Sequence, residues 1–113
     1  MAKVNRVALQ ASSTQTASNN GAAVTSLAQL KELLVFLSVT AVSGTSPTLN
    51  VTIQSSDDGG TTWYNLPNAA FTQATAATTQ ALALTTFGDT LRVSATIGGT
   101  SPSFTYKVTA IGK

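Results

Sequence analysis

The stretch Thr48–Asn65, TLNVTIQSSDDGGTTWYN, decides the fold class of this chain. It begins with a strict alternation, in which the apolar residues Leu49, Val51 and Ile53 are separated by polar ones. A period of two residues is typical of a β-strand with one buried and one solvated face. Asp and Gly residues follow, and both tolerate the left-handed backbone of a tight turn. The sequence therefore predicts a β-hairpin that returns through Trp63, with an aromatic anchor just after its turn.

The turn of this hairpin matches a known short pattern, the Asp box, written Ser-x-Asp-x-Gly-x-Thr-Trp. The matching residues are Ser56, Asp58, Gly60, Thr62 and Trp63. The Asp box is known from sialidase-like propellers and other β proteins, where it folds a hairpin and has no catalytic role of its own. The resemblance therefore implies a structural role for these residues. A calcium site or a catalytic carboxylate at Asp57 and Asp58 is the alternative.

Length and composition indicate a single domain with an unusually uncharged surface. The chain has 113 residues, and only 9% of them are charged, against about 25% in an ordinary soluble domain. So little charge suggests that part of the surface is covered in an assembly. The net charge is +2 and the basic residues are scattered. Because a nucleic-acid interface needs several phosphates neutralised by one patch, no nucleic-acid partner is expected.

The residue types that carry most enzyme and metal chemistry are missing. The chain has no Cys and no His, which removes disulfides, thiolate ligands and the commonest general base. The only close acidic pair, Asp57 and Asp58, lies in one turn and cannot flank a substrate as glycosidase carboxylates do. We therefore expect no enzyme activity, no cofactor and no metal site. No apolar run is long enough for a signal peptide or a membrane span, so no membrane partner is expected either.

Alternating apolar residues predict further strands at 33–42, 81–85, 91–97 and 104–110. The expected fold is all-β, an antiparallel β-sandwich or jelly roll of about seven or eight strands. Turn signals predict hairpins at 42–49, 56–63 and 97–104, with a long loop between 69 and 80. Helix is limited to one short turn near Leu27–Lys31.

Two of the expected hairpins repeat the same four residues. Gly-Thr-Ser-Pro occurs at 44–47 and again at 99–102. Aligning the two places Val51 and Ile53 on Tyr106 and Val108, and places Phe36 on Leu91. The repeat suggests that the fold contains two similar halves.

The chain divides into an N-terminal arm at 1–23 and a β-domain at 24–113. The arm is polar and small, and its first part, 2–9, forms either an edge strand or an extended segment that docks on a neighbour as an added strand. Leu34 and Phe36 lie on the second face of a long strand, either against the arm or at a subunit interface. The candidate interface residues are Lys3, Val4, Arg6, Val7, Leu9, Leu34 and Phe36.

From Leu49 onward the chain resembles small β-sandwich virion proteins of tailed bacteriophages, of the head decoration (cement) type. The segments that carry the resemblance are LNVTIQSSDDGGTTWYNLP at 49–67, FGDTLRVSATIGGTSPSF at 87–104 and YKVTAIGK at 106–113. The resemblance implies a structural protein on the capsid surface, made in the host cytoplasm. It also implies the major capsid protein as a partner and self-association as a homotrimer.

Two rival functions remain open. The chain could be a tail, neck or fibre component of a virion. It could also be a carbohydrate-binding β-sandwich module, which needs exposed aromatic side chains to stack on sugar rings. The candidates are Trp63, Tyr64 and Tyr106, and the hairpin pattern favours a structural role for Trp63.

Overall fold

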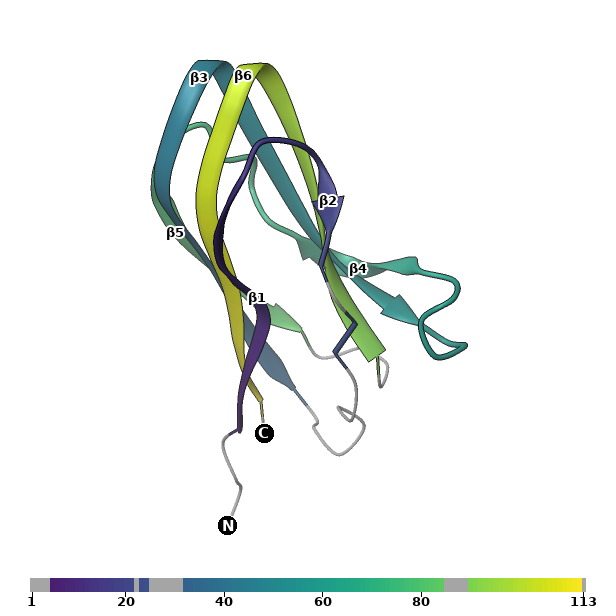
Figure 1. Ribbon diagram of the computed structural model, residues 1–113. Helices are drawn as coiled ribbons and strands as arrows, with labels where there is room; N and C mark the ends of the chain where they lie inside the picture. Colours follow the sequence, from purple (N-terminus) through teal and green to yellow (C-terminus); the bar gives the residue numbers. More distant parts are fainter. Residues whose placement is uncertain (1–4, 22, 25–31, 85–89, 113) are drawn as a thin grey trace.

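The computed structural model of the chain describes residues 5–21, 23–24, 32–84 and 90–112. Its strands are β1 (Asn5–Gln15), β2 (Asn19–Asn20), β3 (Leu33–Ser56), β4 (Tyr64–Ala70), β5 (Thr78–Leu84) and β6 (Thr90–Gly112) (Figure 1). All are linked into one antiparallel sheet, and the described residues contain no helix. The all-β prediction is confirmed. The finer expectation of a sandwich or jelly roll is not, since the six strands belong to a single connected sheet. The helical turn expected near 27–31 lies outside the described residues.

The centre of the sheet is the pairing of β3 with β6, which runs from Leu33 opposite Gly112 to Ser56 opposite Thr90. Each of these long strands bends over at its Gly-Thr-Ser-Pro segment, so that each forms an arch (Figure 1). The hairpins predicted at 42–49 and 97–104 are therefore wrong. The residues on either side of each bend pair with the other long strand, as Leu49 does with Ile97, and not with each other. A turn signal predicts that the chain changes direction, but it does not predict which strand pairs with the residues on either side of the turn.

The two bends pack against each other with matching geometry. Gly44 and Gly99 have φ angles of 112° and 111°, and Ser46 and Ser101 both have φ of 49°. A Cβ atom on Gly44 would lie 2.6 Å from the carbonyl oxygen of Ser101, and one on Gly99 would lie 2.7 Å from that of Ser46. Only glycine fits such a close backbone approach at positive φ. The repeat seen in the sequence is thus a local two-fold relation between the two bends.

The shorter strands complete two more arches, one on each side of the central pair. The chain passes from β1, which pairs with the end of β6, to β2, which pairs with its beginning. It likewise passes from β4, on the end of β3, to β5, on its beginning. We call β1, residues 104–112, residues 33–42 and β5 the first half-sheet, and β2, residues 90–97, residues 49–56 and β4 the second half-sheet. The bends place the two half-sheets face to face (Figure 1).

The core lies between the half-sheets and takes alternate residues from the longer strands. Its fully buried members include Val35, Leu37, Leu49, Val51, Ile53, Leu91, Val93, Phe104, Tyr106 and Val108. Val51 and Ile53 are buried, as are the residues aligned with them in the sequence, Tyr106 and Val108.

The predicted equivalence of Phe36 with Leu91 is wrong. Leu91 is fully buried, whereas Phe36 is only partly buried and lies on the alternate face of β3 from Val35 and Leu37. The cause is a bulge between Val39 and Ala41, where β3 carries one residue that has no partner in β6. One extra residue reverses which side chains face the core. Between the bulge and the start of β3, equivalent residues are therefore displaced by one position. Phe36 corresponds to Arg92 and not to Leu91.

The described part of the expected N-terminal arm belongs to the sheet. Residues 5–15 form β1 and pair with β6, and Leu9 is only 3% exposed in the core. The edge-strand alternative for this region is what the structure shows, and residues 5–15 are not a separate arm. The reason is that Val7 and Leu9, two residues apart, both reach apolar surface inside the fold. Lys3 and Val4 lie outside the described residues.

Candidate protein-interaction surface

The loop between β3 and β4 is closed by two side chains near its start. The Ser56 hydroxyl donates to Asp58 Oδ1 at 2.7 Å and accepts from the Gly60 N–H at 2.8 Å. Asp58 Oδ1 also accepts from the backbone N–H groups of Thr61 and Thr62 at 3.1 and 2.8 Å. The strands on both sides pair with each other, with Ser55 opposite Tyr64. Residues 56–63 therefore form a true hairpin loop, in which Asp58 replaces water as the acceptor for exposed amides.

These hydrogen bonds set the acidity of Asp58. The backbone N–H of Thr62, then the hydroxyls of Ser56 and Thr62, hold the pKa of the Asp58 carboxyl well below its usual 3.8. Hydrogen bonds donated to a carboxylate favour its charged form. With its oxygen engaged inside the loop, Asp58 acts here as a structural acceptor. The described residues hold no group of three or more His, Cys, Asp or Glu that could bind a metal ion.

Trp63 packs against the hairpin loop and is only partly buried. Its indole N–H donates to the Gly60 carbonyl at 3.1 Å. The guanidinium carbon of Arg92 lies 4.5 Å from the Trp63 ring centroid, within cation–π range. Arg92 Nε also donates to Gln54 Oε1 at 2.8 Å, and Gln54 in turn donates to Asn65. One face of the ring is thus occupied from within the protein.

The aromatic residues proposed for sugar stacking differ in access. Tyr106 is 1% exposed, and burial raises the pKa of its phenol. Trp63 is covered on one face by Arg92, whereas Tyr64 is 54% exposed. Ligand sites are usually lined by apolar and aromatic side chains with a few polar groups placed among them. Tyr64 is the one candidate of the three that is largely open to solvent.

The outer face of the first half-sheet carries an apolar patch. Leu34 is 41% exposed, and its neighbours across the strands are Ile111 on one side and Ala83 on the other. In the next row Phe36 lies between Thr109 and Ala81. We define the outer patch as Arg6, Ala8, Leu34, Phe36, Ala81, Ala83, Thr109 and Ile111. Contiguous exposed apolar surface of this kind marks contact sites in soluble proteins.

A shallow groove crosses this patch between β1 and β3. Its volume is about 380 Å³, and Arg6, Ala8, Phe36, Thr109 and Ile111 are among the residues that line it. The structure thus brings together three of the predicted interface residues, Arg6, Leu34 and Phe36, on one outer face. Leu9 is buried in the core, and Val7 packs against the core although it also lines part of the groove.

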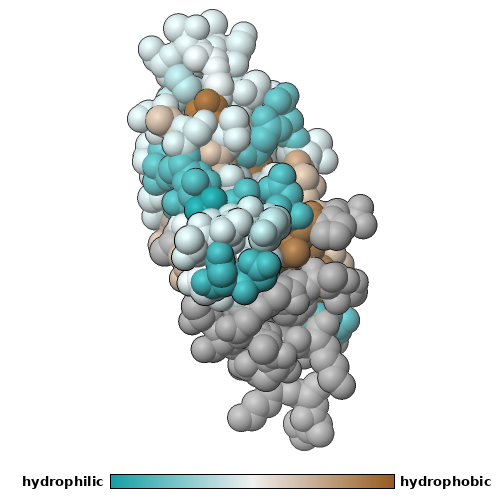
Figure 2. Space-filling view, turned by 90° about the vertical axis from the view of Figure 1, so that its right-hand side faces the viewer, coloured by the Kyte–Doolittle hydropathy of each residue, from teal (hydrophilic) through white to brown (hydrophobic). Residues whose placement is uncertain are grey.

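The outer face of the second half-sheet is polar. Its central residues face each other in pairs, Asn50 with Thr96, Thr52 with Ser94 and Gln54 with Arg92. Figure 2 views the side of the molecule that bears the β3–β4 hairpin, where hydrophilic surface predominates and brown atoms are confined to small areas. This face has the composition of a surface that stays in water.

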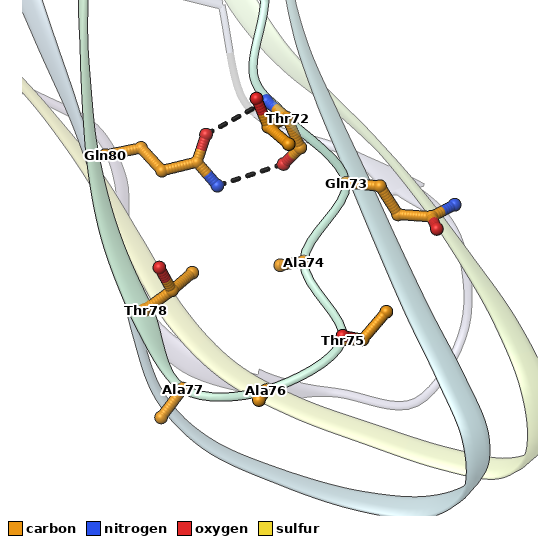
Figure 3. Close-up of a pocket in the computed structure, with 8 residues that line it drawn as sticks. All are labelled: Thr72, Gln73, Ala74, Thr75, Ala76, Ala77, Thr78 and Gln80. Carbon is orange, nitrogen blue, oxygen red and sulfur yellow. Dashed lines mark hydrogen bonds between the residues drawn. The ribbon is translucent and has the colours of Figure 1, made fainter.

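A second hollow lies inside the arch that joins β4 to β5 (Figure 3). It has a volume of about 470 Å³ and is lined by backbone and small side chains of Thr72–Thr78, together with Gln80. The Gln80 amide accepts from the Thr72 N–H and donates to the Thr72 carbonyl, both at 2.9 Å. The Gln80 amide is therefore used in holding the arch closed.

Comparison with known proteins shows the fold and no family. Neither a protein-family description nor a curated protein sequence matches the chain. Among solved structures, the SPBc2 prophage-derived protein YomS is similar over 99% of this chain and 96% of its own, with a TM-score of 0.52 and 11% identity. A protein of Bacillus endospore appendages, described as a novel family of disulfide-linked pili, is similar over 97% of this chain and 85% of its own, with a TM-score of 0.52 and 14% identity. None of the described residues form a helix long and apolar enough to cross a membrane.

Proposed function

We propose that this chain is a structural protein of a bacteriophage particle, which works by making contacts with other proteins and not by catalysis. The observation that carries the proposal is the outer patch, an apolar area around Leu34 and Phe36 on a fold whose opposite outer face is polar. Likeness to a prophage-derived protein over nearly the full length of both chains supports a phage origin.

Within that class, the role that fits best is decoration of the capsid surface. The outer patch would lie on the major capsid protein and bridge neighbouring capsid subunits, burying apolar surface that is otherwise exposed. Arg6 at the rim of the groove would add a charged contact to this apolar centre. The homotrimer implied by the resemblance to decoration proteins stays a prediction for the chain on the particle, which the number of copies at each capsid site tests.

An extracellular filament is the second candidate, and a specific observation favours it. The spore appendage protein shares the fold at the same TM-score as the prophage protein. A tail or fibre component would use the same outer patch against copies of itself or its neighbours along the filament.

Binding of purified chain to particles that lack it tests the proposal. The wild-type chain should bind a saturable number of sites on the head and protect it against heat or dilution. The variant Leu34→Ser/Phe36→Ser should lose most of this binding. The matched control, Thr52→Ala/Ser94→Ala on the polar outer face, should bind as the wild type does.

Three results would count against decoration. Binding to tails or fibres and not to heads would favour the second candidate. Equal binding by the patch variant and its control would exclude the outer patch as the contact. Absence of the chain from purified particles, by mass spectrometry, would exclude a virion role altogether.

A further inference from the structure

The free edges of the sheet differ in how well they are protected against pairing with another strand. β1 carries Arg6 and two irregularities of register, and β2 has only two residues. β4 contains Pro67, which lacks a backbone N–H, and an irregular register. β5 has none of these features. Bulges, charge, proline and shortness are the devices by which proteins prevent edge-to-edge association.

β5 is a regular seven-residue strand with one side paired. All seven residues, Thr78 to Leu84, pair with β3 in unbroken register. Among the described strands, β3 is its only ladder partner. The sequence TTQALAL contains no charge and no proline. Because backbone N–H and C=O groups of alternate residues point away from β3, the edge offers a ready row of hydrogen-bond partners to a second strand.

A second copy of β5 fits this edge. An antiparallel pair related by a two-fold axis at Ala81 would place Ala81 opposite its own mate and Thr79 opposite Ala83. In such a self-pair any charged residue at the centre would face a like charge, and β5 has none. Thr79, Ala81 and Ala83 are exposed and small, so they leave room for the partner strand.

The pairing would also enlarge the outer patch. Ala81 lies beside Phe36 and Ala83 beside Leu34 on the same outer face. A two-fold axis at Ala81 therefore joins two outer patches into one continuous apolar surface across eight strands. We propose that β5 is a self-association edge, through which two copies of this chain form a dimer with one continuous first half-sheet. The inference concerns the isolated chain and holds whether or not the chain decorates a capsid.

Introducing a charge of either sign at Ala81, the centre of β5, tests the dimer. The full chain should sediment as a dimer at tens of micromolar. Ala81→Lys and Ala81→Glu should each raise the dissociation constant by about a hundredfold or more, because each variant faces its own like charge. An equimolar mixture of the two variants should restore the dimer. The control Ala8→Lys, on the outer face of β1, should leave the dimer unchanged.

A single cysteine gives an independent readout in this cysteine-free chain. Ala81→Cys should form a covalent dimer on mild oxidation, and Ala8→Cys should not. A monomer or a trimer in the wild type would overturn the inference, as would an unchanged dimer in Ala81→Lys. Dissociation by Ala8→Lys to the same extent as by Ala81→Lys would indicate head-to-tail pairing of β5 with β1 and would also overturn it. Far-ultraviolet circular dichroism of each variant confirms that the β fold is kept.

Discussion

The outer faces of the two half-sheets are built from equivalent strands, but only the first carries an apolar patch. On the first half-sheet, Leu34 and Phe36 stand beside Ile111 and Ala81. On the second, the position equivalent to Phe36 is Arg92, which bonds Gln54 and covers Trp63. The inward faces of the same strands are mostly apolar, although Ser55 and Thr90 are also buried.

This difference separates what the fold requires from what it does not. Both half-sheets need an apolar inner face, because burying it stabilises the packing of the half-sheets against each other. Neither needs an apolar outer face, and the second half-sheet is built without one. The outer patch is therefore not explained by folding, and this is the ground for the proposed contact with another protein.

We expect the largest loss of stability from substitutions in the two equivalent bends. Gly44→Ala and Gly99→Ala should each lower the free energy of unfolding by about 3–5 kcal/mol, from positive-φ strain together with a clash against backbone atoms. Because the two sites have matching surroundings, the two losses should agree closely. The control is Gly59→Ala, where φ is also positive but nothing lies within 4 Å, and it should lose only about 1 kcal/mol. Denaturant unfolding measures all three, and clearly unequal losses at Gly44 and Gly99 would contradict the two-fold relation.

The next largest loss of stability is expected from changes in β1, and it tests whether this strand belongs to the fold. Leu9→Ala should lower the free energy of unfolding by about 2–3 kcal/mol, because it removes a buried side chain at the sheet edge. Arg6→Ala, which is exposed on the same strand, should change it by less than about 0.5 kcal/mol. Deletion of residues 2–20 should likewise lower the melting temperature clearly. If the deletion left it unchanged, β1 would be a dispensable arm in solution.

A smaller loss of stability concerns the hairpin loop between β3 and β4 and depends on pH. The pKa of Asp58 is lowered in the folded chain, so its ionised form contributes stability that is fully present above the unfolded value, near 4. That contribution is lost as the pH falls below 4, toward the folded pKa. Asp58→Asn should therefore melt a few degrees below the wild type at pH 7, and the difference should shrink in acid. A difference that stayed constant from pH 7 to pH 2 would show that the charge of Asp58 has no part in it.

The sequence predicted the strands well and their partners poorly. The alternation of Leu49, Val51 and Ile53 predicted the buried face of this strand. The Asp and Gly residues that follow predicted the hairpin at 56–63. Alternation within one strand carries no information about which distant strand lies beside it, so the bends at Gly44 and Gly99 were interpreted as hairpins. The two Gly-Thr-Ser-Pro segments contained the missing signal, because identical turns far apart in sequence can pack on each other.

The candidate surface was found only in part. Leu34 and Phe36 stood out because they are apolar residues on the second face of a strand, and both lie on the outer patch. Val7 and Leu9 were grouped with them because the polar residues that follow made the N-terminus look like an arm. Ala81, Ala83 and Ile111 were missed, since small or isolated apolar residues acquire meaning only from the strands beside them.

The smallest expected change in stability comes from substituting Arg92, and it tests how this residue differs from its equivalent, Phe36. Arg92→Ala removes the cation over Trp63 and the hydrogen bond to Gln54, and it should lower the free energy of unfolding by about 1 kcal/mol. Arg92→Lys keeps a cation near the ring but loses the planar guanidinium, so it should recover about half of that loss. Arg92→Phe, which copies the first half-sheet, should keep contact with Trp63 and preserve stability, but it should lower solubility by giving the second outer face an apolar patch of its own. Denaturant unfolding and concentration-dependent light scattering measure the two quantities. If Arg92→Phe stayed as soluble as the wild type, apolar character alone would not make an outer face associate, and the argument from the outer patch would lose its main support.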